Sequence, residues 1–291
     1  MGAFDFVKKV MPRRLKIQDR FHVRKEMISG TMSKFYMVED KVSGKTFGLK
    51  VLDKEKTKQF EDRFKVLKVK KPSEGEIAMK FDNPYIAKTL EIGTTDHGEP
   101  YLLMEYLHGT GLNNILLIKQ DLLAGGRMRY IRQCAEALAH VHSRGFIHRD
   151  YCPRNLMFTG DGTALKLIDF GLSVPNQPPF TDAGNRTGTP EYMAPELIRR
   201  QPTSEKLAVF SFGVTMYELC TRQLPWPTAS RGGLAAMSHD QPATPITELR
   251  PSINPRLARA IHSCILPNPK DRPSMQDFLT AIRTVKYEDG Q

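Results

Sequence analysis

The residues best suited to chemistry lie in the second half of the sequence, in two short runs. The first run contains Asp150 and Asn155, and the second begins at Asp169, fourteen residues after Asn155. Phosphoryl transfer requires that an acceptor hydroxyl be positioned and that a metal ion neutralise charge on phosphate oxygens. Asp150 is suited to accept or orient the hydroxyl proton, while Asn155 and Asp169 offer the oxygen ligands that Mg²⁺ prefers. These residue types and their spacing therefore favour phosphoryl transfer.

The two runs resemble the catalytic loop and the metal-binding motif of protein kinases. They read His148-Arg149-Asp150-Tyr151-Cys152-Pro153-Arg154-Asn155 and Asp169-Phe170-Gly171, and Ala194-Pro195-Glu196 follows in the family's order. Three motifs at this spacing are far more specific than any one of them alone. The resemblance covers about residues 21–285. It implies the bilobal α+β kinase fold, with a small β-rich lobe carrying one main helix and a large helical lobe.

The segment before the third motif indicates the class of kinase. It ends Gly188-Thr189-Pro190-Glu191, which resembles the serine/threonine class more than the tyrosine class. The resemblance implies transfer of the γ-phosphoryl group of ATP to Ser or Thr hydroxyls of protein substrates, with ATP in the cleft. Asp150 is then the catalytic base, and Asn155 and Asp169 hold Mg²⁺, or Mn²⁺ in its place.

The first half of the sequence offers the partners that the resemblance requires. Lys50 matches the strand lysine that contacts the α- and β-phosphates in the family. Its expected helix partner is Glu74, ten residues before Pro84, and Glu76 is the alternative. Either residue alone would be better explained as a solvated charge on a basic lobe, but their register with the other motifs favours the pair.

The resemblance also implies a set of nucleotide-binding positions. These are Gly30, Phe35, Gly48, Lys50, Met104, Glu105, Leu107 and Met157. Gly30 is the one glycine that remains of the family's glycine-rich loop, and Phe35 stands where the family has a valine above the adenine. Gly48 replaces the usual alanine, so the larger and the smaller residue together could conserve the volume of the site. The alternative is that Phe35 turns outward.

The segment between Gly171 and Ala194 has the proline and glycine content of a loop and matches an activation segment. Within it, Thr187 is the first expected phosphorylation site and Thr181 the second, with Arg149 as the residue that would pair with the phosphate. The alternative for Thr187 is an ordinary polar loop residue. Thr189 is expected beside Asp150 at the substrate platform.

Two positions depart from the family pattern. Cys152 stands where serine/threonine kinases carry a lysine, and Arg154 is the expected substitute for its charge. Ala208 replaces a buried aspartate that anchors the catalytic loop. These departures keep a pseudokinase, which would bind nucleotide or act as a scaffold, as the main alternative. A small-molecule kinase fits less well, because Ala194-Pro195-Glu196 belongs to a protein-docking platform.

Periodicity places these residues on definite elements. Short β-like runs at residues 35–38, 46–52 and 101–104 dominate the first part, with a helix near 73–81. Helical periodicity follows at 127–143, 208–220 and 255–265. The expected organisation is a basic extension at 1–20, a kinase domain at 21–285 and a tail at 286–291. Within the domain the small lobe spans about 21–104, the hinge 105–111 and the large lobe 112–285. Glu196 is expected to pair with Arg272.

Composition limits the alternatives. Hydrophobic residues make up 40% and charged residues 26% of the 291 positions, as in soluble globular proteins. No apolar stretch approaches the length of a membrane span. The four cysteines are widely spaced, which indicates reduced thiols and a cytoplasmic location.

The net charge of +11 is concentrated partly near the start of the chain. It invites an anionic partner, but the basic runs lack the interleaved aromatics of a nucleic-acid platform, so no nucleic acid is expected. Residues 1–20 combine apolar and basic residues, so contact with a membrane surface is conceivable. An extension that is packed on the small lobe or frayed is the preferred interpretation.

Overall fold

The chain divides into two compact units in this computed structural model, which describes residues 14–27, 32–65, 69–118, 122–184, 186–226 and 241–290. Unit 1 consists of Met1–Asp82 and Ala87–Leu107, and unit 2 of Asn83–Ile86 and His108–Gln291. The change of unit after Leu107 falls within residues 105–111, which the sequence marks as a hinge.

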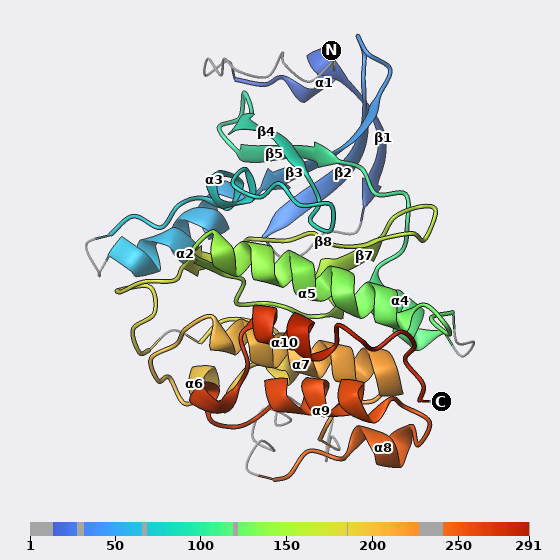
Figure 1. The fold of residues 1–291 in the computed structure, drawn as a ribbon. Coiled ribbons are helices and arrows are strands. Elements are labelled where there is room, and N and C mark those ends of the chain that lie inside the picture. The colour runs from blue at the N-terminus through green and yellow to red at the C-terminus, as the bar shows by residue number, and fades with distance from the viewer. Residues whose placement is uncertain are drawn as a thin grey trace. The chain divides into compact units, whose positions relative to one another are not determined.

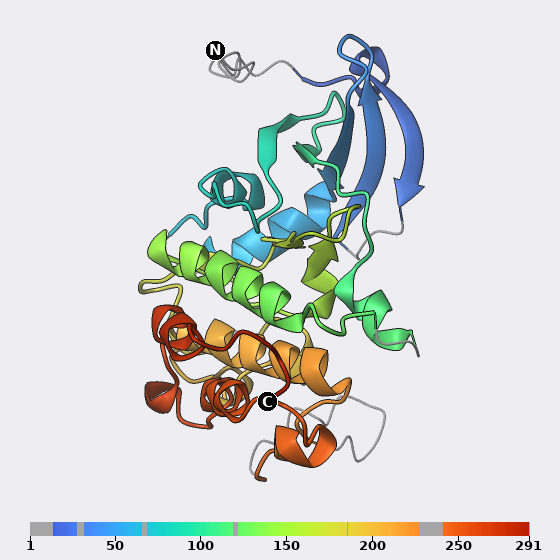
Figure 2. The same ribbon diagram turned by 45° about the vertical axis from the view of Figure 1, so that its right-hand side comes forward.

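Unit 1 is built on a five-stranded antiparallel sheet with the strand order β1-β2-β3-β5-β4 (Figures 1 and 2). The strands are β1 (Phe21–Met27), β2 (Ser33–Asp40), β3 (Thr46–Leu52), β4 (Thr89–Thr94) and β5 (Pro100–Glu105). Because side chains alternate along a strand, each strand presents residues to two different faces. The three predicted β-runs correspond to β2, β3 and β5.

One face of this sheet carries a hydrophobic core. Its buried members are Leu15, Phe21, Val38, Leu49, Val51, Tyr101 and Leu103. Leu15 precedes β1, yet its backbone N–H donates to the Thr94 carbonyl at 2.9 Å, and its carbonyl accepts from the Asp96 N–H at 3.0 Å. Residues 14–20, including the one-turn helix α1 (Ile17–Arg20), are therefore part of the packed unit and extend it before residue 21.

Two further helices belong to unit 1. The helix α3 (Glu74–Ala78) begins with a capping box between Ser73 and Glu76, and is shorter than the predicted 73–81. The helix α2 (Lys54–Lys65) has no counterpart in the sequence-based prediction, which expected one main helix in this lobe. Its buried residues Phe60 and Phe64 are four positions apart and make an edge-to-face ring contact.

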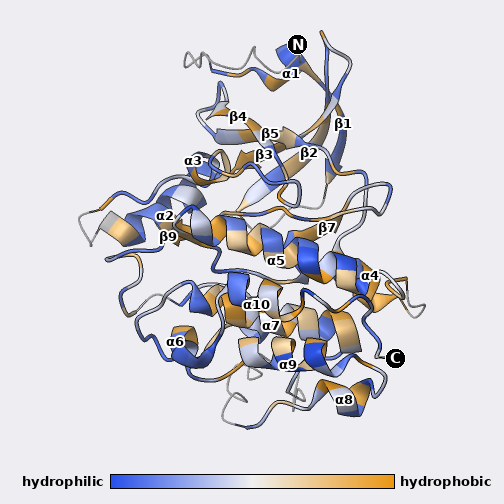
Figure 3. Cartoon of the chain, in the orientation of Figure 1, coloured by the Kyte–Doolittle hydropathy of each residue, from blue (hydrophilic) through white to orange (hydrophobic). Residues whose placement is uncertain are grey.

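Unit 2 is mainly helical (Figure 1). Its longer helices are α5 (Arg127–Ser143), α7 (Lys206–Thr221), α9 (Pro255–Cys264) and α10 (Met275–Ala281), and the shorter ones are α4 (Leu112–Leu117), α6 (Pro195–Ile198) and α8 (Ile246–Leu249). The helix α7 packs against α5 and α9, and is buried on nearly all sides, as its apolar colouring in Figure 3 indicates. No helix within the described ranges is both long and apolar enough to cross a membrane.

Four short strands of unit 2 hold the chemically important runs in place. Strand β6 (Phe146–Ile147) pairs with β9 (Val174–Pro175), and β7 (Leu156–Phe158) pairs with β8 (Leu165–Leu167). The run that contains Asp150 lies between β6 and β7, and Asp169 follows β8. Each run is thus fixed at both ends by backbone pairing.

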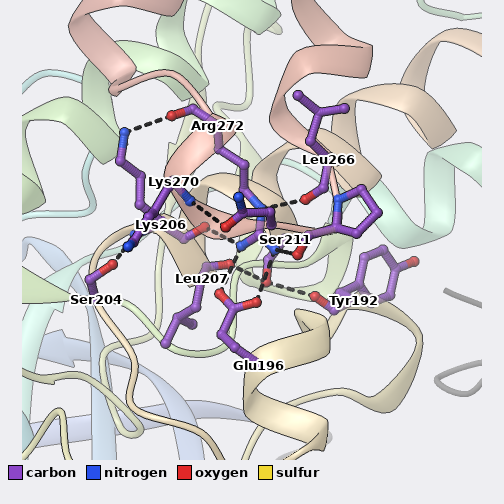
Figure 4. Close-up of polar contacts among 11 residues, drawn as sticks. Tyr192, Glu196, Ser204, Lys206, Leu207, Ser211, Leu266, Lys270 and Arg272 are labelled. Atoms are coloured by element: carbon purple, nitrogen blue, oxygen red, sulfur yellow. Dashed lines mark hydrogen bonds and ion pairs between the residues drawn. The ribbon is translucent and has the colours of Figure 1, made fainter. Parts of the chain in front are cut away.

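A buried ion pair ties helix α6 to the segment before α10, as expected from the sequence (Figure 4). The guanidinium of Arg272 donates to both carboxylate oxygens of Glu196, at 2.7 and 2.9 Å. Its remaining N–H groups donate to backbone carbonyls, including those of Leu266 and Lys206. This full set of hydrogen bonds compensates for the burial of the charge.

The C-terminal residues are also part of unit 2. Glu288 is 4% exposed and accepts hydrogen bonds from the Gly125 N–H at 2.8 Å and from Arg127 at 3.3 Å. Asp289 accepts two hydrogen bonds from Arg250, at 2.8 and 2.7 Å. The residues after 285, expected to form a tail, therefore pack against the fold as far as residue 290.

Candidate active site

Asp150 is held in a fixed orientation by two neighbours. Its Oδ1 accepts hydrogen bonds from the backbone N–H of Thr189 at 2.8 Å and from the Thr189 hydroxyl at 2.6 Å. The side-chain amide of Asn155 donates to Oδ2 at 3.1 Å and to the Asp150 carbonyl at 2.7 Å. The carboxylate is thus already in contact with a hydroxyl group, which is the arrangement a general base requires.

The backbone around Asp150 is shaped by unusual dihedral angles. Arg149 has a φ of 44°, which is uncommon for a residue with a side chain. Gly188 has a φ of 136°, and a Cβ on it would lie 2.8 Å from the Arg149 carbonyl oxygen. Only glycine allows the two segments to approach so closely. That approach brings Thr189, the next residue, to Asp150.

His148 connects this loop to the segment that begins at Asp169. Its ring is 1% exposed, and Nε2 is hydrogen-bonded to the backbone carbonyl of Asp169. Burial lowers the pKa of His148, so the neutral imidazole is favoured. The ring also meets Phe170 edge to face at 5.3 Å between centroids. His148 is therefore a positioning residue that the sequence analysis quoted but did not assign.

Asn155 and Asp169 offer a donor set that fits Mg²⁺. The amide nitrogen of Asn155 is used on Asp150, so its oxygen remains as the group that can ligate a cation. Asp169 accepts the Gly171 N–H on Oδ1 at 2.8 Å. The described residues contain no cluster of three or more His, Cys, Asp or Glu side chains for a metal. A site of one carboxylate and one amide suits Mg²⁺, which takes its other ligands from phosphates and water.

Arg154 reaches the same hydroxyl as Asp150. Its Nη2 donates to the Thr189 Oγ1 at 2.8 Å, so Thr189 connects the Arg154 guanidinium with the Asp150 carboxylate. Cys152 is fully buried, with its sulfur 3.6 Å from the Thr189 oxygen. Burial and the nearby Asp150 charge raise the pKa of the Cys152 thiol. The thiol is therefore neutral, and Arg154 supplies the positive charge beside Asp150.

In unit 1, Lys50 pairs with Glu74 and not with Glu76. The distance from Lys50 Nζ to Glu74 Oε1 is 2.6 Å, and the two residues are 9% and 8% exposed. Glu76 instead closes the capping box with Ser73. Strand β3 and helix α3 thus hold the ammonium group in one place.

The structure shows the surroundings of several positions that are expected to bind nucleotide. The Phe35 ring lies over Gly48, so Phe35 does not take the alternative orientation in which its side chain turns outward. Met104 is paired with Gly48 across the sheet. The Glu105 N–H donates to the Lys88 carbonyl at 2.9 Å, so a hydrogen bond between this backbone and a base would be accepted by the Glu105 carbonyl. Met157 lies in β7 of unit 2.

The structure says less about Leu107 and Gly30, the other two positions expected to bind nucleotide. Leu107 is partly buried at the end of unit 1, and Gly30 lies outside the described residues.

The expected phosphorylation sites lie in different environments. The Thr187 hydroxyl is buried, and no hydrogen-bond partner for it lies among the described residues. Thr181 is partly exposed, and its carbonyl accepts the Thr203 N–H at 2.8 Å. Arg149 is 2% exposed, and burial lowers its pKa to about 10. Phosphorylation of Thr187 would therefore require local movement of the segment.

Ala208, the second departure from the family pattern, lies in a helix whose neighbouring residue Phe210 makes aromatic contacts. Ala208 is completely buried in α7. Phe210, two positions later in α7, is stacked on Trp226 with 5.8 Å between ring centroids. The Arg272 guanidinium lies 4.8 Å from the centre of the same ring.

Two polar residues of α7 were not assigned a role from the sequence. Glu218 accepts a hydrogen bond from the Tyr192 hydroxyl at 2.5 Å, and the Ser211 hydroxyl donates to the Tyr192 carbonyl at 2.7 Å. Burial raises the pKa of Glu218. Both residues interrupt an otherwise apolar helix, and that interruption is the signal that could have identified them. They position the segment that follows Thr189.

Comparison with known proteins gives a consistent family. A family model described as protein kinase domain matches residues 21–281. The serine/threonine-protein kinase pkn3 of Myxococcus xanthus is 32% identical over 226 residues, which are 74% of this chain and 41% of that protein. A Drosophila melanogaster protein named mitogen-activated protein kinase kinase kinase 7-like is 33% identical over 234 residues, covering 76% of this chain and 58% of that protein.

A human relative belongs to the same set. The hormonally up-regulated neu tumor-associated kinase of Homo sapiens is 32% identical over 243 residues, covering 82% of this chain and 33% of that protein. The chain thus spans between 33% and 58% of the length of these three relatives.

Proposed function

The chain belongs to the protein kinase family, and on that premise we propose that it transfers the γ-phosphoryl group of ATP to Ser and Thr hydroxyls of proteins. The observation that carries the proposal is the contact between Asp150 Oδ1 and the Thr189 hydroxyl at 2.6 Å. It supports a carboxylate that is placed and oriented to receive a hydroxyl proton. The serine/threonine class is further supported by the name of the Myxococcus xanthus relative.

The residues divide the work as follows. Asp150 orients the acceptor hydroxyl and takes its proton, and Arg154 contributes positive charge at the same place. Lys50, held by Glu74, would contact the phosphates of ATP. Mg²⁺, or Mn²⁺ in its place, would be held by Asn155 and Asp169 and would neutralise charge on the phosphate oxygens.

A pseudokinase remains the alternative that the experiment must exclude. That alternative would be favoured by loss of Lys50, Asp150 or Asp169, and all three are present. Cys152 removes one cation, but the contact of Arg154 with Thr189 supports a replacement. Active catalysis is therefore the better supported function.

The expected partners and location are less specific. We expect protein substrates, because the chain is a protein kinase by family. We expect no nucleic-acid partner, because the basic runs of the sequence lack interleaved aromatic residues, and the residues expected at a membrane surface lie mostly outside the described ranges. The four buried free cysteines support the expected cytoplasmic location.

The direct test is transfer of radioactive phosphate from [γ-³²P]ATP, with Mg²⁺, to the protein itself and to a generic basic protein. Asp150→Asn and Lys50→Met should each reduce transfer by about 10²-fold or more. Asp161→Asn is the matched control, because Asp161 is an exposed carboxylate in the β7–β8 turn of the same unit. Phosphorylated residues are identified by mass spectrometry, with Thr187 and Thr181 as the expected sites.

The outcomes separate the two functions. Transfer by the wild type and by Asp161→Asn, but not by the other two variants, supports the kinase. A wild type that binds ATP without transferring phosphate would make the pseudokinase the better description.

A further inference from the structure

Two buried polar groups beside the catalytic loop have no hydrogen-bond partner among the described residues. They are Nδ1 of His148 and the hydroxyl of Ser173. We propose that Ser173 is a positioning residue for the reaction: its hydroxyl forms a hydrogen bond with Nδ1 of His148, directly or through one buried water. The inference rests on the proposed function and goes beyond it, because Ser173 lies outside the residues assigned to the site.

The two residues occupy opposed positions on the two sides of a short ladder. Ile147 of β6 pairs with Val174 of β9, so the next two positions in this antiparallel register are His148 and Ser173. Side chains at opposed positions lie on the same face of a ladder, with Cβ atoms about 4.5–5.5 Å apart. The N–H of Ser173 donates to the Phe170 carbonyl at 3.0 Å, which fixes the backbone of the serine. The register therefore brings the hydroxyl and the imidazole together.

The surroundings of the His148 ring leave one edge for a polar partner. Nε2 is hydrogen-bonded to the Asp169 carbonyl. The ring meets Tyr151 and Phe170 edge to face, with 5.8 and 5.3 Å between centroids. Because a carbonyl oxygen only accepts, Nε2 carries the proton of its bond, and Nδ1 of the neutral ring is an acceptor. The Ser173 hydroxyl can donate to that nitrogen. It can equally accept from a protonated ring, so the match does not depend on the charge of the histidine.

Burial makes this hydrogen bond important. Ser173 is completely buried, and His148 is 1% exposed. Buried polar groups in native proteins are nearly always hydrogen-bonded, so two complementary groups at opposed positions are best explained as partners. The bond holds the imidazole at both of its nitrogens. Through Nε2 it then fixes the loop that carries Asp150 relative to Asp169.

The kinetic test compares variants at position 173 that differ in the hydroxyl. Ser173→Ala removes it, while Ser173→Thr and Ser173→Val have nearly the same shape and only the threonine keeps it. Steady-state phosphorylation of the generic basic protein should show kcat lowered by about threefold to tenfold in Ser173→Ala relative to the wild type, and in Ser173→Val relative to Ser173→Thr. The KM for the basic protein should stay within about twofold, because no group that contacts it is removed.

A buried hydroxyl elsewhere in unit 2 provides the matched control. Thr215 is completely buried in α7, and its hydroxyl donates to the Ser211 carbonyl of the same helix at 2.8 Å. Thr215→Val should leave kcat unchanged, whatever its effect on the melting temperature.

A second comparison asks whether Ser173 acts through His148. His148→Phe removes the acceptor nitrogen and keeps an aromatic ring. Adding Ser173→Ala to this variant should change kcat by less than about twofold, because the partner of the hydroxyl is already gone.

A spectroscopic measurement tests the contact without catalysis. The full chain is labelled with ¹⁵N in its eight histidines, and the Nδ1 signal of His148 is identified by its loss in His148→Phe. Ser173→Ala should move this signal toward that of a nitrogen without a hydrogen bond. Ser173→Thr should leave it close to its position in the wild type.

Four results would overturn the inference while leaving the proposed function intact. They are an unchanged kcat in Ser173→Ala, equal activities of Ser173→Thr and Ser173→Val, losses that multiply in the combined variant with His148→Phe, and a nitrogen signal that Ser173→Ala does not move. A wild type that transfers no phosphate would instead overturn the proposed function, and the nitrogen signal would then decide whether the contact exists. Thermal unfolding identifies any variant that fails to fold.

Discussion

The Asp150 carboxylate is not isolated in its loop, because Thr189 and Arg154 are joined to it by hydrogen bonds. The Thr189 hydroxyl is held by Asp150 at 2.6 Å and by Arg154 at 2.8 Å, so the three groups form one chain of charge-assisted hydrogen bonds. The neutral thiol of Cys152 lies beside them and cannot provide charge. The cation therefore comes from the residue two positions later, on a planar guanidinium instead of a flexible ammonium.

This arrangement predicts a rescue between two positions. Arg154→Ala should lower kcat by about 10²-fold, because it removes the positive charge that the Arg154 guanidinium places beside Asp150 through Thr189. Adding Cys152→Lys to that variant should recover at least about tenfold, because a lysine there restores a positive charge near Asp150. Steady-state phosphorylation of a peptide substrate measures both effects, and ATP dissociation constants show whether binding is preserved.

The controls concern charge and packing separately. Cys152→Ala removes the thiol without adding charge and should leave kcat close to that of the wild type. Equal activity of Arg154→Ala and the wild type would assign Arg154 a structural role only. Failure of lysine at position 152 to raise activity would show that the cation must come from position 154.

At the scale of elements, the C-terminal residues 286–290 act as a strap across unit 2. Asn254 donates its N–H to the Glu288 carbonyl at 2.8 Å, and the Glu288 side chain reaches Arg127 at the start of α5. Arg250 adds a second contact to Glu288, at 3.6 Å. The carboxylate is thus surrounded by two guanidinium groups and is 4% exposed. The strap links α5 to the beginning of α9.

Replacing Glu288 tests this role. Glu288→Ala should lower the free energy of unfolding by about 3–5 kcal/mol, because it leaves the Arg127 charge buried without its partner carboxylate. Asp289→Asn, in the next and more exposed residue, should cost clearly less. Urea unfolding followed by circular dichroism gives both values. Equal small losses in the two variants would mean that the strap contributes little to stability.

Periodicity explains which elements could be predicted. The helix α5 has the predicted limits, because Ile131, Ala135 and Leu138 recur at spacings of three and four and all three are buried. The sequence analysis did not predict helix α2, because the many lysines of this segment look like a run of solvated charged residues. Its signals were nevertheless present: Asp53 accepts the Lys56 N–H at 3.0 Å as a cap, and Phe60 and Phe64 form its apolar face.

The sequence allows a prediction of which residues form the candidate site, but not of how their side chains are arranged. Spacing within the two motifs predicted Asp150, Asn155 and Asp169 as site residues, because each motif keeps its residues at fixed separations. The choice of Glu74 over Glu76 depended on the capping box at Ser73, which fixes how α3 begins. The position of the Phe35 ring depended on a rotamer, and volume alone selects none.

At the scale of the whole molecule, charge and burial make stability depend on pH. The chain carries a net charge of +11 with its eight histidines neutral, so every histidine that protonates adds to an existing excess of positive charge. Burial lowers the pKa of His148 and of His262. Carboxylates such as Asp40 and Asp289 have lowered pKa values, so their contribution is lost only below about pH 4. Above that range the buried histidines contribute, together with Glu218, whose pKa is raised by burial.

His142, near the end of α5, should have the clearest effect. Burial lowers its pKa from 6.5 to about 4, with Glu205 opposing the shift and His148 and Lys206 adding to it. Its Nε2 has no hydrogen-bond partner among the described residues. A histidine with a lowered pKa contributes stability that is complete above pH 6.5 and is lost as the pH falls toward 4, because the unfolded chain binds the proton first.

The prediction is a difference between two stability profiles. Between pH 6.5 and 4.5 the free energy of unfolding of the wild type should fall faster than that of His142→Asn, by up to about 1.4 kcal/mol per pH unit, the limit for one proton. Urea unfolding at half-unit steps of pH measures both profiles. His97→Asn is the control, because the side chain of His97 is 82% exposed, and its profile should follow the wild type. Parallel profiles for the wild type and His142→Asn would contradict the prediction, because they would show that His142 takes up its proton equally readily in the folded and unfolded chain.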